Sequence, residues 1–188
     1  MARAYTKELI QKAFVECLDE MPLGKISVTE IARRCEINRN TFYYYYSDIY
    51  AVLNEILDLE LEQAISRYNR TQSWEEGFIQ GANFALQHRI AVSHIYHSMQ
   101  REELEQFLFH IAGDVMIRFV HDQNEEVGAS EETCRSIAFF YQCALTQMIL
   151  QWIASGMQMD ADRSIRRTGE LFNGNIKISL ERSLGLSH

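Results

Sequence analysis

The chain has 188 residues, 47% of them hydrophobic, which is enough for a buried core and for one domain or two small ones. With one proline and nine glycines, it is a poor candidate for a β-rich fold with many turns, and long helices are favoured. The net charge of -8 argues against a general nucleic-acid coat protein, yet residues 1–50 hold seven basic and seven acidic residues, so the excess acid lies in residues 51–188.

The cysteines and the N-terminal residues bear on location. The four cysteines show neither a metal-binding spacing nor the framework of a secreted disulfide protein, and each stands where a helix would place a small apolar residue. We therefore expect reduced thiols in a cytoplasmic protein. The first ten residues lack an apolar run of signal-peptide length, and we expect no segment to approach the roughly 18 uncharged residues of a membrane span.

The first predicted helix covers residues 6–20, where Ile10, Phe14 and Leu18 recur at helical spacing, and Pro22 follows its end. It is expected to pack against the elements that follow. Two basic residues, Lys7 and Lys12, and Arg3 before them lie near an end that a DNA backbone could approach. Solvated surface charges explain them equally well.

Residues 27–46 predict a helix-turn-helix. Ser27 and Glu30 form a capping-box pattern, in which Ser27 accepts from an amide and Glu30 reaches back to the backbone of Ser27. Residues 35–37 are then short enough to be only the turn, because Asn38 is a good N-cap for a second helix. In that helix Phe42 and Tyr46 fall on one buried stripe. The alternative is an ordinary helical hairpin, which the capping and the spacing disfavour.

The runs VTEIARR at 28–34 and INRNTFYYYY at 37–46 resemble the N-terminal DNA-binding domain of the tetracycline-repressor-like (TetR/AcrR) family of transcriptional regulators. The resemblance covers about the first 55 residues. It is specific at Ile31-Ala32, Thr41, Tyr43 and Tyr46. Two positions depart from the family pattern: Glu36 stands where a turn glycine is usual, and Ile49 where a phosphate-contacting lysine usually opens the fourth helix.

The exposed face of the second helix supplies the candidate DNA contacts. Arg39 is the first choice for contacting bases, because an arginine at the leading end of a recognition helix bonds guanine in two places, and Tyr44 and Asn40 follow. Thr41 and Tyr43 match family positions that usually hold phosphate. Thr29, at the start of the preceding helix, could contact either, and the orientation of Tyr45 stays open.

The rest of the chain is predicted to be helical. Ser47-Asp48 caps a long helix from residue 49 to 65, which leads out of the small domain and is a natural lever for a switch. A break at 71–73 precedes a helix to Gln87 opened by a second capping box at 73–76. Further helices are expected at 88–98, 102–121, 130–155 and 162–184, with an exposed acidic loop at 122–132.

The helix at 130–155 is apolar around most of its circumference, so it needs cover on more than one side. A second subunit is the expected source, through a four-helix interface with the last helix, where Gly169 and Gly174 would let a neighbouring helix approach. The family resemblance implies the same homodimer. The candidate interface residues are Tyr141, Leu145, Met148, Trp152, Phe172 and Ile176.

The middle of the chain is rich in aromatic residues and methionine. They are either plain core or the lining of a pocket for an apolar or aromatic effector, which the family resemblance implies. The candidate lining residues are Phe84, Tyr96, Met99, Phe107, Met116, Phe139 and Tyr141.

Other chemistry has little support. His94 and His97 share a helical face, but no carboxylate or cysteine pattern adjoins them, so ordinary histidines are favoured over a metal site. No catalytic triad, phosphate-binding loop or paired-carboxylate signature is present, and neither an enzyme nor a cofactor is expected.

The resulting expectation is an all-α protein with a helix-turn-helix domain at 1–48 and an effector-binding and dimerisation domain at 49–188. It would act as a homodimeric, ligand-responsive repressor on palindromic double-stranded DNA, without membrane contact. The alternative is a protein-interaction module on the same fold with weak or lost DNA binding, of which Glu36 and Ile49 would be signs.

Overall fold

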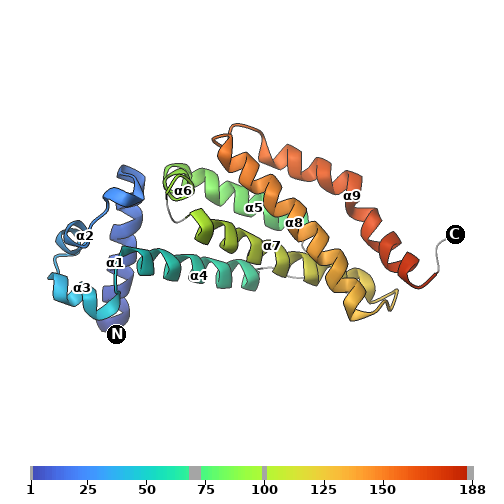
Figure 1. Ribbon diagram of the computed structural model, residues 1–188, viewed down its shortest axis with the longest axis horizontal. Helices are drawn as coiled ribbons and strands as arrows, with labels where there is room; N and C mark the ends of the chain where they lie inside the picture. Colours follow the sequence, from blue (N-terminus) through green and yellow to red (C-terminus); the bar gives the residue numbers. More distant parts are fainter. Residues whose placement is uncertain (1, 68–72, 99–100, 186–188) are drawn as a thin grey trace. The chain divides into compact units, whose positions relative to one another are not determined.

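A computed structural model describes residues 2–67, 73–98 and 101–185, and the regular structure in these residues is entirely helical, as predicted. Figure 1 shows the order of the helices along the chain. They are α1 (Ala2–Glu20), η1 (Leu23–Lys25), α2 (Val28–Arg34), α3 (Arg39–Tyr45), α4 (Ile49–Arg67), α5 (Trp74–Gln87), α6 (Arg89–Tyr96), α7 (Arg101–Asn124), α8 (Glu131–Ala154) and α9 (Ala161–Ser183). Two residues of the predicted break, Thr71 and Gln72, lie outside the described residues.

The chain forms two compact units. The first comprises Met1–Glu60 and His88–Leu104, and the second Leu61–Gln87 and Glu105–His188. Hence α4 and α7 each begin in the first unit and end in the second, whereas α6 belongs wholly to the first. The sequence did not predict this placement of α6, because its periodicity shows which of its faces is buried but not which helix covers that face.

The core of the first unit surrounds α1. Ile10, Phe14 and Cys17 of α1 are fully buried, together with Ile31 of α2 and Phe42 of α3. The predicted buried stripe of α3 is confirmed, because Tyr46 after the helix is also 5% exposed. The helix α1 begins four residues earlier than the pattern at 6–20 predicted.

The predicted helix caps are present. The side chains of Ser27, Asn38 and Ser130 accept from the amides of Glu30, Thr41 and Thr133, each three residues further on. Asp48 accepts from two amides at the start of α4, both at 2.9 Å. Such a cap stabilises a helix by typically about 1 kcal/mol.

The second half of the first capping box was predicted incorrectly. The carboxylate of Glu30 does not accept from the backbone amide of Ser27. Both of its oxygens accept from Arg33, and one of them also accepts from Arg34. Two arginines on the same helix are stronger partners for a carboxylate than a neutral amide, because these bonds are charge-assisted.

The core of the second unit joins α5, α7, α8 and α9, with Trp74, Met116, Leu145, Ile176 and Leu180 among its buried residues. The indole of Trp74 donates to Asn173 of α9, whose amide donates to Glu75. A Cβ on Gly169 would lie 2.1 Å from Glu75 Oε1, so this glycine permits a close approach of α5 and α9. No such role is seen for Gly174, where an added Cβ would meet open space.

The helix α8 corrects the expectation about membrane spans. Residues 136–159 contain no charged side chain, and α8 is long and apolar enough to cross a membrane by length and composition, with 33% of the apolar window buried. The core helix of a soluble protein passes the same test. Cys134, Ala138 and Leu145 of α8 lie in the core of the second unit, so α8 is such a core helix.

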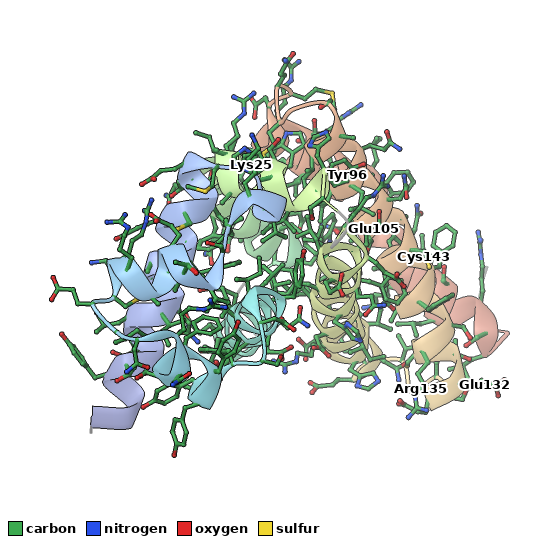
Figure 2. The ribbon with its side chains drawn as sticks, turned by 60° about the vertical axis from the view of Figure 1, so that its left-hand side comes forward. Lys25, Tyr96, Glu105, Glu132, Arg135 and Cys143 are labelled. Carbon is green, nitrogen blue, oxygen red and sulfur yellow. The ribbon has the colours of Figure 1, made fainter. Side chains whose placement is uncertain are left out.

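The cysteines are free thiols. Cys17 and Cys134 are buried as small apolar residues, as predicted, and burial raises the pKa of both thiols. Cys143 departs from that prediction because it is exposed on α8, where Figure 2 labels it.

Candidate nucleic-acid interface

The turn between α2 and α3 uses a non-glycine residue in a glycine conformation. Glu36 has φ 55°, in the left-handed region, and the amide of Ile37 bonds the carbonyl of Ala32 at 2.9 Å. An L side chain there costs roughly 1 kcal/mol, and Glu36 tolerates it because it is exposed. Glu36 therefore adopts the backbone conformation that a turn glycine would take at this position.

Beyond this turn, α3 presents polar side chains to solvent. Arg39 and Asn40 are exposed, and Tyr43 and Tyr44 are 47% and 65% exposed. Arg39 Nη2 donates to Tyr43 Oη at 3.3 Å, and its guanidinium carbon lies 5.9 Å from the ring centroid. This contact joins two side chains one turn apart on α3, and a guanidinium has further N–H groups with which it can donate to other acceptors.

Thr29 and Thr41 differ in their availability. Thr29 is exposed on α2, whereas Thr41 is half-buried and its hydroxyl donates to Asn38 Oδ1 at 3.1 Å. The same oxygen accepts from the Thr41 amide at 2.7 Å. Because its hydrogen is engaged in the cap, the Thr41 hydroxyl must leave Asn38 before it can donate to a phosphate.

Two arginines of α2 are held by carboxylates. Arg34 bonds Glu20 and Glu30, and Arg33 bonds Glu30. The hydrogen bonds that Arg33 and Arg34 donate lower the pKa of Glu30 to about 2, and the bonds that Arg34 donates to Glu20 and Glu30 raise the pKa of Arg34. The two arginines differ in exposure, because the Arg33 side chain is 69% exposed and the Arg34 side chain 17%.

A polar cluster ties α1 to α4. Lys7 and the hydroxyl of Tyr46 both bond Glu55, and Gln11 Nε2 donates to Tyr46 Oη and to Glu55, each at 3.2 Å. Burial favours protonated Glu55, but the bonds from Lys7 and Tyr46 outweigh it and lower its pKa. Burial also raises the pKa of Tyr46, and its bond to Glu55 adds to the effect. Lys7 thus bonds Glu55 within residues 2–60, which we call the head, and its side chain is 37% exposed.

Ile49 is 8% exposed and packs in the core, so the position where the family usually has lysine offers no charge to a phosphate. Among the described side chains of α1 to α3 and η1, Lys12, Lys25 and Arg39 form no ion pair. The positive charge available to a DNA backbone is therefore smaller than the seven basic residues suggest.

Comparison with known proteins decides the family. Residues 72–174, more than half of the chain, match the family model described as "Transcriptional regulator C-terminal region" of the TetR regulators. The chain belongs to the TetR family of transcriptional regulators. This family is not one of enzymes, as the sequence predicted.

A solved structure supports the same fold for this TetR-family chain. The protein titled "Dihydroxyacetone kinase operon activator DhaS" superposes with a TM-score of 0.76 at 19% sequence identity, covering 92% of this chain and 97% of that chain. At this identity the likeness shows the fold alone. No curated protein matches the sequence.

The residues predicted to line the effector pocket differ in exposure. Phe84 and Phe139 are 43% and 57% exposed, and Met116 is fully buried in the core. Tyr96 belongs to the first unit, and these three belong to the second. Phe107 and Tyr141 are half-buried, and Met99 lies outside the described residues. Aromatic and methionine composition indicates apolar surroundings but cannot distinguish a core residue from a lining one.

One groove of about 460 Å³ runs between α7 and α8. Of the predicted pocket residues, Phe139 lines it, together with Gly113, Ile117 and Arg135. A Cβ on Gly113 would lie 2.6 Å from Gln142 Nε2, and that amide donates to the carbonyl of Phe109. Figure 2 shows Arg135 near the beginning of α8.

The residues predicted for a dimer interface fall into two groups. Leu145, Trp152 and Ile176 are at most 6% exposed and pack inside the protomer, with Tyr141 half-buried beside that core. Met148 and Phe172 are 43% and 44% exposed. Sequence periodicity found the apolar helices but did not separate the stripe that meets their own core from the stripe that faces outward. The exposed apolar residues of α8 and α9 are Phe139, Phe140, Met148, Leu171, Phe172 and Ile178.

The two histidines considered as metal ligands have other partners. His94 Nδ1 lies 2.7 Å from the carbonyl of Leu18, and His97 Nδ1 lies 2.8 Å from that of Ser93. In the part of the chain that the structure describes, no three His, Cys, Asp or Glu side chains gather as a metal site would require.

Proposed function

We propose that this TetR-family regulator binds double-stranded DNA sequence-specifically through α2 and α3. The observation that carries the proposal is the solvent-facing set on α3, where Arg39, Asn40, Tyr43 and Tyr44 offer donors beyond a properly formed turn. Arg39 and Asn40, at the leading end of the helix, would contact base edges. Tyr43 and Thr29 would contact phosphate, and Thr41 would do so only after leaving its cap.

The protein would act as a homodimer in the cytoplasm, with the helix-turn-helix at 1–48 and the rest of the chain serving effector binding and dimerisation. The support is the set of exposed phenylalanine and other apolar side chains on α8 and α9. A second copy covering some of these side chains would place two DNA-binding domains on a palindromic site with half-sites about 34–36 Å apart or more. The effector would be an apolar or aromatic small molecule that favours the DNA-free arrangement.

The direction of control is proposed as repression. The name of the solved structure DhaS describes that protein as an operon activator. Reporter expression from the promoter of the regulated gene distinguishes the two: deletion of a repressor raises expression, and deletion of an activator lowers it.

Binding to the DNA that flanks its own gene tests the proposal. The full-length protein should prefer a fragment of this DNA over competitor DNA in a fluorescence-anisotropy titration at fixed salt. Arg39→Ala should weaken specific binding by about 1–3 kcal/mol, roughly 5- to 150-fold, and relax the base preference. The control is Arg118→Ala, which removes an exposed arginine from α7. If Arg39→Ala keeps the same base preference, Arg39 does not contact the bases.

A second candidate function has support from the charges of the head. Arg33, Arg34 and Lys7 are paired with carboxylates and Ile49 is buried, which suits a protein-interaction module with weak DNA binding. The dependence of DNA affinity on salt separates the two, because each neutralised phosphate contributes about -0.9 to the slope. Among the described side chains Lys12 and Lys25 form no ion pair, so two copies offer four such lysines to phosphate, which predicts a slope of about -4 for the regulator. The interaction module predicts a slope near zero.

A further inference from the structure

The C-terminal end of α1 lacks one hydrogen-bond donor of its own. The carbonyl of Cys17 accepts from the amide of Met21 at 2.9 Å, so the next carbonyl in the helix, that of Leu18, would accept from residue 22. Residue 22 is Pro22, which has no N–H. The carbonyl of Leu18 therefore needs a donor from elsewhere.

That donor comes from α6, 76 residues further along the chain. His94 Nδ1 lies 2.7 Å from the Leu18 carbonyl oxygen. Because a carbonyl oxygen only accepts, Nδ1 carries the hydrogen and donates it. Ala91 and Ile95, three residues before and one after His94, are each 6% exposed, so the histidine lies on the buried side of α6.

We propose that His94 is a positioning residue for DNA binding: it completes the end of α1 and thereby joins α6 to the helix on which α2 and α3 pack. This inference rests on the proposed DNA binding. Along the chain α6 lies between α5, which belongs to the second unit, and α7, most of which does. A change in the second unit that displaces α6 would break the His94 bond and loosen the end of α1.

The molecule offers a matched control three residues away. His97 also lies at the end of α6, but its Nδ1 bonds the carbonyl of Ser93 in the same segment, and its side chain is exposed. His94→Ala and His97→Ala thus remove the same chemical group, and only the first removes a bond to α1. His94→Asn is the rescue variant, because an asparagine Nδ2 occupies nearly the same position as the histidine Nδ1.

Amide hydrogen exchange of the full-length protein without DNA tests the completed helix end. In His94→Ala, exchange in the last two turns of α1 and in α6 should accelerate about 3- to 10-fold, as expected for the loss of one net hydrogen bond. His97→Ala should stay within about 2-fold of the unaltered protein, and His94→Asn should restore most of the protection. Equal effects of the two alanine variants, or no rescue by asparagine, would overturn the role of the donated bond.

The same variants with DNA test the positioning role. With its preferred DNA bound, the unaltered protein should gain protection in α6 as well as in α3, because coupling between two sites is reciprocal. In His94→Ala the gain in α6 should disappear while that in α3 remains, and affinity should fall several-fold with an unchanged salt slope. A full gain in α6 would overturn the role. If the unaltered protein prefers no DNA, the proposed function fails and the positioning role falls with it, whereas the exchange without DNA still decides whether His94 completes α1.

Discussion

Two helices of this molecule expose aromatic side chains, and the chemistry of those side chains differs. On α3 the exposed rings are tyrosines, Tyr43 and Tyr44, whereas on α8 they are phenylalanines, Phe139 and Phe140. A phenol offers a hydroxyl to phosphates, bases and ordered water, and a phenyl ring offers only apolar area. The tyrosine face suits the polar, wet interface of a protein with DNA, and the phenylalanine face suits the dry centre of a protein interface.

The two regions also differ in how they use charge. In the head, carboxylates hold Lys7, Arg33 and Arg34 in bonds that link or cap its helices. In the second unit the ion pair between Lys177 and Glu126 lies on the surface, with side chains 43% and 75% exposed. Both units have an apolar core, and the head adds to its core two charged contacts between helices, Lys7–Glu55 and Arg34–Glu20.

The largest expected effect concerns the α8 face. Phe140→Glu should prevent dimerisation, because it would place an unpaired carboxylate at the centre of an apolar interface. We expect the dimer dissociation constant to rise more than 100-fold, so that light scattering at micromolar concentration shows a monomer. The control Phe84→Glu alters an exposed phenylalanine on α5 and should leave the dimer intact. If both variants form dimers, the exposed side of α8 is not part of the dimer interface.

Next in size is the cap of α3. Asn38→Ala removes the acceptor for both the amide and the hydroxyl of Thr41, and should cost about 1–2 kcal/mol of unfolding free energy. Ser130→Ala, which removes the cap of α8, should cost a similar amount. DNA binding separates them, since only Asn38→Ala disturbs the recognition helix. Equal DNA affinities would contradict the role given to the α3 cap.

A smaller effect of opposite sign is expected at the turn. Glu36→Gly relieves the left-handed backbone and should stabilise the protein by about 0.5–1 kcal/mol in a urea titration. Met157 has nearly the same φ, 56°, but its side chain is 4% exposed. Met157→Gly should therefore destabilise by about 2 kcal/mol or more, because the burial lost exceeds the strain relieved. If both glycine variants stabilise the protein, the burial lost at Met157 does not exceed the backbone strain relieved there.

The smallest effect is on the pH dependence of stability. Since the folded-state pKa of Glu55 lies below the ordinary value for a glutamate, its ionised form stabilises the fold above that ordinary pKa. The contribution is lost as the pH falls through the folded-state pKa. Glu55→Gln should flatten the loss of thermal stability between about pH 5 and 3. Glu126→Gln, at an exposed Lys–Glu pair, should change the profile less. If Glu55→Gln and the unaltered protein have identical profiles, the polar cluster around Glu55 does not contribute to the pH dependence of stability.

Short-range features were predictable from the sequence and long-range partners were not. The sequence predicts where three helices begin, because each cap residue and the amide that it bonds are three residues apart. The caps are Ser27, Asn38 and Ser130. The sequence also located the turn at Glu36 and the buried stripe of α3. The bond from His94 to Leu18 and the pairing of Arg34 with Glu20 join residues 76 and 14 positions apart, and no local pattern encodes them. The predicted pocket residues remain a prediction, and half of the predicted interface residues, Leu145, Trp152 and Ile176, are buried within the protomer.

Selection of preferred sequences from a random pool of double-stranded DNA by the purified full-length protein tests the central proposal most directly. The account predicts a palindromic site whose half-site centres lie about 34–36 Å apart or more, lost in Arg39→Ala and Phe140→Glu and kept in Arg118→Ala. No enriched sequence, or enrichment unaffected by Arg39→Ala, would contradict it.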